Sequence, residues 1–254
     1  AQPTIALREG EPGRLVFRNL EVAFANGTTV ISDASAEIAG GERVLIQGES
    51  GTGKSTLFRA VGGLWPWGAG EIETPPREHM MFMPQRPYLP LGTLRAVIAY
   101  PAAADAYDPE MVTEALQAVG LAALAARLDD TERWDRVLSL GEQQRLAFAR
   151  LLLHQPRWIF MDEATAALDE ANQDAMMELV ISRLPEAALV SIGHRPGLEV
   201  FHTRTLRLER AEGGATLTRP ARRTARDREW SRRPRRSGGG RLGRVRNWFR
   251  GRDF

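Results

Sequence analysis

One nine-residue stretch constrains this chain more than any other. Residues 48–56 have the sequence Gly-Glu-Ser-Gly-Thr-Gly-Lys-Ser-Thr, a full match to the phosphate-binding pattern G-x-x-x-x-G-K-[ST]. Its glycines let backbone N–H groups turn inward around a polyphosphate, at the positive end of the helix that follows. We expect Lys54 to reach the β- and γ-phosphates and the Ser55 hydroxyl to ligate Mg²⁺. The predicted nucleotide site is the whole stretch: Gly48, Glu49, Ser50, Gly51, Thr52, Gly53, Lys54, Ser55 and Thr56.

Lysine usage favours this interpretation over a glycine-rich turn that only caps a helix. The chain has 34 lysines and arginines, and Lys54 is its single lysine. A compact ammonium on a flexible stem fits a phosphate loop, whereas a broad planar guanidinium does not. The single lysine therefore stands at the position where phosphate binding requires an ammonium group.

Four short apolar runs predict strands that are buried on both faces, as in a parallel sheet covered by helices. They are residues 44–46, 80–83, 158–161 and 187–192. The first leads into the phosphate loop, and the others lead into Pro84-Gln85, Asp162-Glu163 and Gly193-His194. Because ligands bind at the carboxyl ends of parallel strands, we expect these groups to gather along one edge of an α/β fold.

Weaker patterns fill in the rest of the chain. Residues 15–24 predict a strand, Asn26-Gly27 a hairpin turn, and residues 28–31 the return strand. Residues from about 87 to 155 lack a strong strand pattern and predict a helical insertion. Helical patterns occupy residues 55–61, 110–119, 121–128, 140–153 and 170–184, and closing strands are predicted at 203–208 and 215–218.

Charge divides the chain into two unlike parts. Residues 221–254 hold 13 arginines against three acidic residues, a net charge of +10, while the other 220 residues carry −8. The basic part is rich in Arg, Gly, Ser and Pro and predicts a disordered tail. The chain has no cysteine, which suits a reducing compartment, and it begins with Ala1 rather than Met, which predicts a piece of a longer protein.

An apolar strand that ends in two acids is more often a strand end in solvent than a site. Beside a phosphate loop, however, Asp162 and Glu163 predict a Walker B arrangement. Asp162 would hold Mg²⁺ through water, and Glu163 would orient or deprotonate the attacking water.

The segment 138–145, Leu-Ser-Leu-Gly-Glu-Gln-Gln-Arg, has two interpretations. An ordinary capping box explains Ser139 and Glu142, but not the polar block 143–145 on an otherwise apolar helix. The segment resembles the LSGGQ signature of ABC ATPases. In that family, the serine and the helix N-terminus, here Ser139, Gly141 and Glu142, contact the γ-phosphate bound to the opposite subunit. Two domains then sandwich two ATP molecules.

Further residues fall into the family's order. Gln85 matches the Q-loop glutamine, which senses Mg²⁺ and faces the membrane domain. Asp169 ends a match to the D-loop, His194 matches the switch histidine at the γ-phosphate, and Phe24 stands where an aromatic stacks on adenine. Taken alone, His194 is more often a surface histidine and Phe24 a core residue. The resemblance covers residues 15 to about 208.

The resemblance implies a P-loop NTPase fold of the ABC type over residues 1–220: a RecA-like parallel-sheet core, an antiparallel β subdomain and a helical signature subdomain at about 87–155. Two residues depart from the pattern, because Leu140 replaces the first signature glycine and Glu142 the glutamine. The segments 63–66 and 84–88 resemble the bacterial branch that fuses a membrane domain to the ATPase, related to fatty-acyl (ABCD-like) and SbmA/BacA-like transporters.

The resemblance therefore implies an ATP- and Mg²⁺-dependent motor of a membrane transporter. It would act as a homodimer on the cytoplasmic side of the inner membrane, with a transmembrane domain fused upstream of Ala1. The alternative is a soluble ABC ATPase that acts on nucleic acid or ribosomes. Only the Arg-rich tail favours that alternative, and such a tail could equally contact anionic lipid. The transported substrate is not encoded here.

Overall fold

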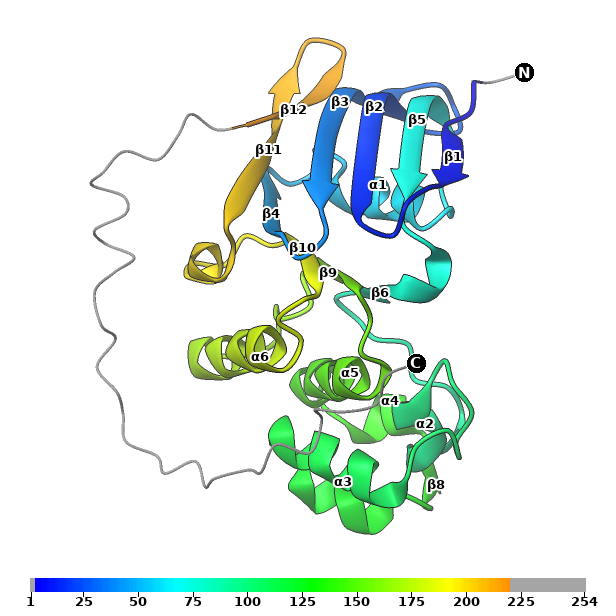
Figure 1. The fold of residues 1–254 in the computed structure, drawn as a ribbon, viewed down its shortest axis with the longest axis vertical. Helices are drawn as coiled ribbons and strands as arrows, with labels where there is room; N and C mark the ends of the chain where they lie inside the picture. Colours follow the sequence, from blue (N-terminus) through cyan, green and yellow to red (C-terminus); the bar gives the residue numbers. More distant parts are fainter. Residues whose placement is uncertain (1–2, 220–254) are drawn as a thin grey trace. The chain divides into compact units, whose positions relative to one another are not determined.

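One ten-stranded sheet organises residues 3–219, the part of the chain that the computed structural model describes (Figure 1). Its strands lie in the order β1-β5-β2-β3-β12-β11-β4-β10-β9-β6. Their bounds are β1 Ala6–Glu9, β2 Arg14–Ala23, β3 Thr29–Ala39, β4 Arg43–Gly48, β5 Gly68–Thr74, β6 Met80–Met83, β9 Trp158–Asp162, β10 Ala188–Ile192, β11 Arg204–Ala211 and β12 Gly214–Thr218. Two short strands, β7 Gly92–Thr93 and β8 Thr131–Glu132, pair with each other. The predicted Arg-rich tail lies outside the described residues.

The four apolar runs form neighbouring parallel strands, as the sequence predicts. Ile192 of β10 pairs with Ile46 of β4 on one side and with Asp162 of β9 on the other. The residues after these strands therefore emerge at one edge of the sheet. The expected burial on both faces is wrong for β6, where Phe82 is 37% exposed. Within residues 3–219, β6 is the last strand in the sheet order, with β9 on one side and no strand on the other.

Alternation along the parallel strands divides the interior into two cores. Leu45, Ile159 and Leu189 pack in the core that contains the buried faces of the helices after β6. Their neighbours Val44 and Phe160 pack in the other core, with α1 and the antiparallel strands. This follows from the strand period of two, which sends successive side chains to opposite faces.

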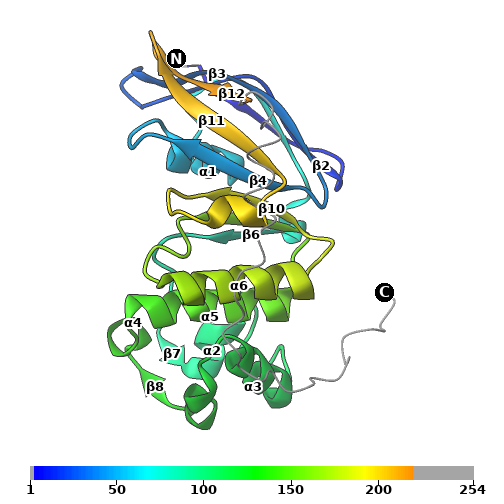
Figure 2. The same cartoon turned by 90° about the vertical axis from the view of Figure 1, so that its left-hand side faces the viewer.

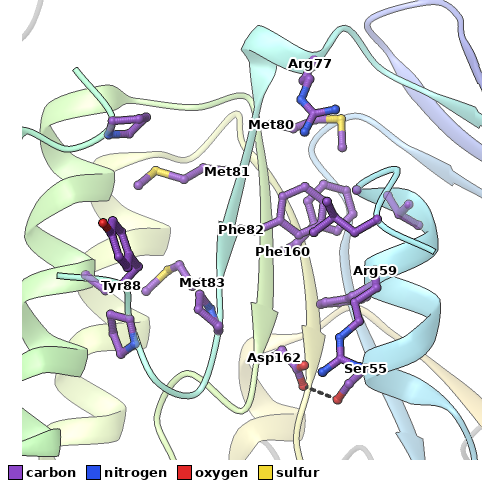
Figure 3. A pocket seen from close by; sticks show the side chains of 18 of the residues that line it. Ser55, Arg59, Arg77, Met80, Met81, Phe82, Met83, Tyr88, Phe160 and Asp162 are labelled. Carbon is purple, nitrogen blue, oxygen red and sulfur yellow. Dashed lines mark hydrogen bonds between the residues drawn. The ribbon is translucent and has the colours of Figure 1, made fainter. Parts of the chain in front are cut away.

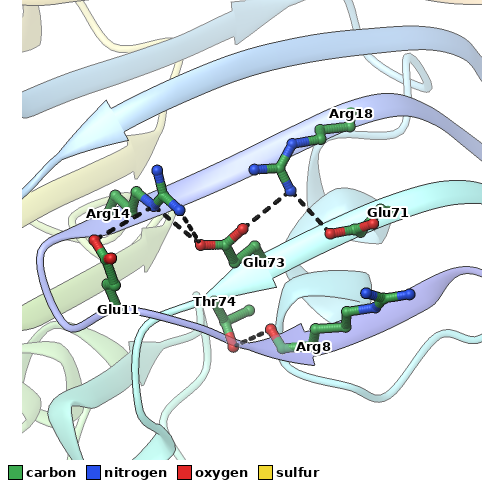
Figure 4. Close-up of polar contacts among 7 residues, drawn as sticks. All are labelled: Arg8, Glu11, Arg14, Arg18, Glu71, Glu73 and Thr74. Atoms are coloured by element: carbon green, nitrogen blue, oxygen red, sulfur yellow. Dashed lines mark hydrogen bonds and ion pairs between the residues drawn. The ribbon is translucent and has the colours of Figure 1, made fainter.

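Ion pairs connect neighbouring strands on the surface of the antiparallel part of the sheet (Figure 4). Arg18 on β2 donates to Glu71 (2.8 Å) and Glu73 (3.0 Å) on β5, and Arg14 donates to Glu73 (3.0 Å). These cross-strand pairs fix the register of β2 on β5. The sequence predicted β2, the hairpin turn and the start of β3, but it missed β1 and β5.

β11 and β12 join the two halves into one sheet. β11 runs parallel to β4, β12 runs parallel to β3, and the two pair with each other as an antiparallel hairpin. Both closing strands were predicted. Their consequence for the site is that Leu208 of β11 lies directly beside Gly48, where the phosphate loop begins.

Helices cover both faces of the parallel strands (Figures 1 and 2). α1 lies between these strands and the antiparallel part, while α5 and α6 pack on the opposite face, with α2, α3 and α4 beyond them. The bounds are α1 Lys54–Val61, α2 Leu94–Ala99, α3 Pro109–Ala118, α4 Trp134–Val137, α5 Leu140–His154 and α6 Glu170–Arg183, with 3-10 helices η1 Arg77–His79, η2 Ala122–Arg127 and η3 Leu198–Phe201. The predicted helix at 121–128 is a 3-10 helix, and α2 and α4 were not predicted. Among residues 3–219, no helix is long and apolar enough to cross a membrane.

Candidate nucleotide-binding site

The phosphate loop leads from β4 into α1 and is shaped by its glycines. Gly53 has a left-handed backbone conformation (φ 90°), and a Cβ at this position would lie 2.5 Å from Cγ1 of Val30. Only glycine fits both constraints. The Thr52 hydroxyl donates to the Glu49 carbonyl (2.9 Å) and closes the loop from inside.

Lys54 is held within this loop. Its ammonium donates to the carbonyls of Gly48 (2.8 Å) and Glu49 (2.7 Å), so the cation lies at the mouth of the backbone cradle. Burial lowers the pKa of Lys54, and the carboxylates of Glu163 and Asp162 oppose this shift. The cation of α1 thus interacts electrostatically with the two acids at the end of β9, as the sequence predicts for one shared edge.

Ser55 and Asp162 meet across the same edge. The Ser55 hydroxyl donates to Oδ1 of Asp162 at 3.1 Å (Figure 3). A hydroxyl beside a carboxylate is an oxygen donor set that suits a hard divalent cation. Of the three residues predicted to hold Mg²⁺, these two lie within hydrogen-bonding distance of each other, and their binding of the ion stays a prediction.

The same pair lines one end of a cavity of about 880 Å³. Methionines of β6 and Tyr88 line other parts of it (Figure 3). Tyr100 is also a lining residue. Phe82 stacks on Phe160 inside this region, with ring centroids 4.6 Å apart. Pro84 and Pro87, which flank Gln85 in sequence, also line the cavity. Arg59 and Arg77 also line the cavity, so charged and apolar side chains are mixed along its wall (Figure 3).

Glu163 faces His194 across the ends of β9 and β10. Oε1 of Glu163 lies 3.7 Å from Nε2 of His194. Glu163 has a positive φ of 51°, which is uncommon for a residue with a Cβ and is typical of functional positions. Its backbone N–H donates to the carbonyl of Ile192 (2.9 Å), which holds this turn in place. His194 is 45% exposed on its side chain, yet it faces the predicted catalytic acid rather than solvent alone.

The signature helix α5 begins with a complete capping box. The Ser139 hydroxyl accepts from the Glu142 N–H (3.3 Å), and Oε2 of Glu142 accepts from the Ser139 N–H (2.8 Å) and hydroxyl (2.7 Å). These hydrogen bonds lower the pKa of Glu142. The capping box is therefore confirmed, while contact of this helix N-terminus with a γ-phosphate of a second subunit stays a prediction.

The remaining predicted residues lie at exposed positions. Phe24 is 43% exposed and meets Trp65 edge to face, so the structure does not place it in the core. Asp169 caps α6 by accepting from the Asn172 N–H (2.7 Å), and this bond lowers its pKa. Gln85 is exposed after β6.

Two contacts at the site were not anticipated. Arg210 of β11 donates to the Ser50 carbonyl (2.9 Å) and pairs with Glu49 (3.2 Å), so it braces the phosphate loop from the neighbouring strand. No sequence signal distinguishes this arginine from the many others. Gln144 is buried and bonds to the backbone of two separate loops. A signal for it existed, because a polar side chain inside an apolar helix needs buried partners.

Comparison with known proteins identifies the fold family. The family model for the ABC transporter matches residues 31–166, which is more than half of the chain. The chain belongs to the ABC transporter family. The matched range contains the phosphate loop, the start of α5 and the two acids at the end of β9.

Relatives from bacteria and plants support this ABC transporter assignment. An uncharacterised ABC transporter ATP-binding protein of Haemophilus influenzae is 42% identical over 198 residues, which is 78% of this chain and 33% of the relative. The chloroplastic ABC transporter D family member 2 of Arabidopsis thaliana is 36% identical over 235 residues, 74% of this chain and 33% of the relative. The inner membrane ABC transporter ATP-binding protein YddA of Escherichia coli is 36% identical over 169 residues, 66% of this chain and 30% of the relative. The chain thus spans about a third of the length of these relatives.

A solved structure has the same fold. It is that of a bacterial Atm1-family ABC exporter with ATP bound, with a TM-score of 0.70 and 25% identity over 83% of this chain and 41% of that chain. The resemblance to ABC ATPases, and to D-family members among them, is therefore confirmed, as is the P-loop fold. The chain is an ABC transporter ATP-binding domain.

Proposed function

We propose that this ATP-binding domain hydrolyses MgATP as the motor of a membrane transporter, with two copies sharing their nucleotide sites. The observation that carries the proposal is the meeting of Ser55, Asp162 and Glu163 beside the phosphate loop. Phosphoryl transfer depends on positioning and on charge stabilisation, and this edge of the sheet provides groups for both.

The nucleotide would lie across the phosphate loop. The loop N–H groups and Lys54 would bind the phosphates, and Phe24 would stack on adenine with its exposed face. Trp65 supports that ring from one edge, with centroids 5.9 Å apart, and is itself anchored because its indole N–H donates to the Ala23 carbonyl (2.7 Å). Three residues would hold Mg²⁺: Ser55, Asp162 and Gln85. When bound, the ion neutralises charge on the β- and γ-phosphates.

Glu163 would carry the proton transfer. Its carboxylate would orient a water and accept its proton as the water oxygen bonds to the γ-phosphorus. The bond from phosphorus to the bridging oxygen breaks, and ADP leaves with that electron pair. His194, 3.7 Å from Glu163, would contact the γ-phosphate from the other side.

The family and the site together suggest two partners for this domain, a transmembrane domain and a second copy of the chain. A transmembrane domain would contact the face that contains Gln85 and the cavity beside β6, where apolar side chains line a concave surface. A second copy would supply the Ser139 end of α5. The Escherichia coli relative, named as an inner membrane ABC transporter ATP-binding protein, supports a cytoplasmic position at the inner membrane. The transporters among the relatives favour this function over a soluble ATPase on nucleic acid. The basic tail could contact anionic lipid.

Two substitutions test the assignment of chemistry. Lys54→Ala should weaken MgATP binding in calorimetry and remove hydrolysis. Glu163→Gln should bind MgATP with nearly the affinity of the unmodified protein but lose turnover by about a hundredfold or more, because it removes only the proton acceptor. Glu170→Gln, on the exposed first turn of α6, serves as the matched control and should retain full activity. Normal turnover in the Glu163→Gln protein would refute the assignment.

A further inference from the structure

Gln144 is a buried polar residue inside the signature helix, three positions after Gly141. It is 0% exposed, and Leu146, Ala147 and Phe148 of the same helix are buried apolar residues. Its Nε2 donates to the Gln85 carbonyl at 2.8 Å, and its Oε1 accepts from the Ala167 N–H at 2.9 Å. One side chain of α5 therefore bonds to the loop after β6 and to the loop after β9.

The chemistry of these partners requires an amide. A carbonyl only accepts and a backbone N–H only donates, so their arrangement fixes which end of the Gln144 amide is oxygen and which is nitrogen. Removing the side-chain amide would leave both partly buried backbone groups without their protein partner, and the loss of each bond costs free energy. A carboxylate could keep the bond to Ala167 but would repel the Gln85 carbonyl.

The loop after β9 is held from its other side as well. Arg195, the residue after His194, donates to the carbonyl of Thr165 (2.8 Å) and also contacts the Leu168 carbonyl. Gly141 packs against this loop, because a Cβ there would lie 3.3 Å from the Ala167 carbonyl. The segment that follows Glu163 thus lies between the start of α5 and the segment that carries His194.

We propose that Gln144 is a positioning residue that couples two loops of the hydrolysis site to the start of α5. It sets the distance from the Gln85 loop and from the 163–169 loop to the N-terminus of α5. This inference rests on the proposed function, since it concerns how accurately Gln85 and Glu163 are placed around the nucleotide. Gln144 touches neither the nucleotide nor the reacting atoms, so it acts through the backbone of its neighbours.

A matched pair of variants tests the coupling. Gln144→Met keeps the length of the side chain and removes both hydrogen bonds. Gln143→Met is the control, because Nε2 of Gln143 also donates to two carbonyls, those of Asp135 (3.0 Å) and Leu138 (2.9 Å), but both lie in α4 and its link to α5. MgATP affinity is measured by calorimetry, and kcat by steady-state hydrolysis, for both variants and the unmodified protein.

The expected result is a split between binding and turnover. Gln144→Met should bind MgATP within about twofold of the unmodified protein, while its kcat falls about tenfold or more because the groups around the γ-phosphate are displaced. Gln143→Met should keep kcat within about twofold even where its melting temperature falls equally. Equal kcat in the two variants would overturn the coupling role. Absence of hydrolysis in the unmodified protein would instead overturn the proposed function on which it rests.

Hydrogen exchange of the unmodified protein gives a test that does not depend on the folding of a variant. The Ala167 residue is exposed, but its N–H is bonded to Oε1 of Gln144. The amide of Ala167 should therefore exchange far more slowly than a free loop amide. Exchange at the rate of an unprotected amide would overturn the proposal.

Discussion

Gly53→Ala should damage the phosphate loop through two separable effects. The left-handed backbone (φ 90°) costs an L-residue about 1–2 kcal/mol. The added Cβ would also lie 2.5 Å from Cγ1 of Val30 and 3.2 Å from Cγ1 of Ile31, an overpacking that typically costs about 1–3 kcal/mol. Together they predict a loss of about 2–5 kcal/mol in the free energy of unfolding.

Gly213→Ala isolates the first effect. Gly213 has nearly the same φ (88°), yet nothing lies within 4 Å of a Cβ built there. Any gain from a less flexible unfolded chain is equal in the two variants and cancels. At about 2–4 °C per kcal/mol for a domain of this size, Gly213→Ala should lower the melting temperature by about 2–8 °C. Gly53→Ala should lower it by about 2–12 °C more.

Calorimetric unfolding and ATP titration check both values. Gly53→Ala should also weaken ATP binding, since the loop must shift away from Val30, whereas Gly213→Ala should not. Equal melting temperatures and equal ATP affinities for the two variants would refute the assigned geometry of the loop.

Two further changes have defined outcomes. Glu142→Gln should preserve the capping box, because an amide oxygen can accept from the Ser139 N–H, and should strengthen ATP-driven dimerisation about fivefold by removing a negative charge worth about 1 kcal/mol near the opposing phosphate. Unchanged dimerisation would argue against a position of the Glu142 carboxylate near the opposing phosphate. Burial is the main cause that lowers the pKa of His202; Arg43 also lowers this pKa, and Glu199 raises it. Because the net effect is a lowered pKa in the native state, the unfolded state binds more protons than the native state below about pH 6.5. Stability should fall as the pH drops through that window, and the fall should be smaller in His202→Gln; identical melting curves between pH 7.5 and 5.5 would contradict this.

The sequence predicted what apolar burial and backbone chemistry determine. β4, β9 and β10 have buried apolar residues at their centres, and burial on both faces leaves few alternative structures for them. The glycines and Lys54 of the phosphate loop were recognisable because each position has a narrow physical requirement. The contacts of Ser55 with Asp162 and of His194 with Glu163 then follow from strand order.

Elements that depend on tertiary partners were missed or misjudged. β1 has four exposed residues, and β5 includes Gly68 and Gly70, so neither has a strong strand pattern. They form because β2 offers a pairing edge to β5, and β5 to β1. The apolar segment at 121–128 has the composition of a helix but forms the 3-10 helix η2. The role of Gln144 depends on two loops that only the fold brings together.

Sedimentation of the Glu163→Gln protein with MgATP tests most directly whether two copies share their nucleotide sites. Without turnover, ATP should hold two chains together, so the measured mass should double when ATP is added. Adding Ser139→Arg at the start of α5 should abolish this dimer by bulk and by repulsion of the opposing Mg²⁺ site, while each chain still binds ATP. A Ser139→Arg protein that dimerises as readily as its parent, or a parent that binds ATP and stays monomeric, would contradict the shared site.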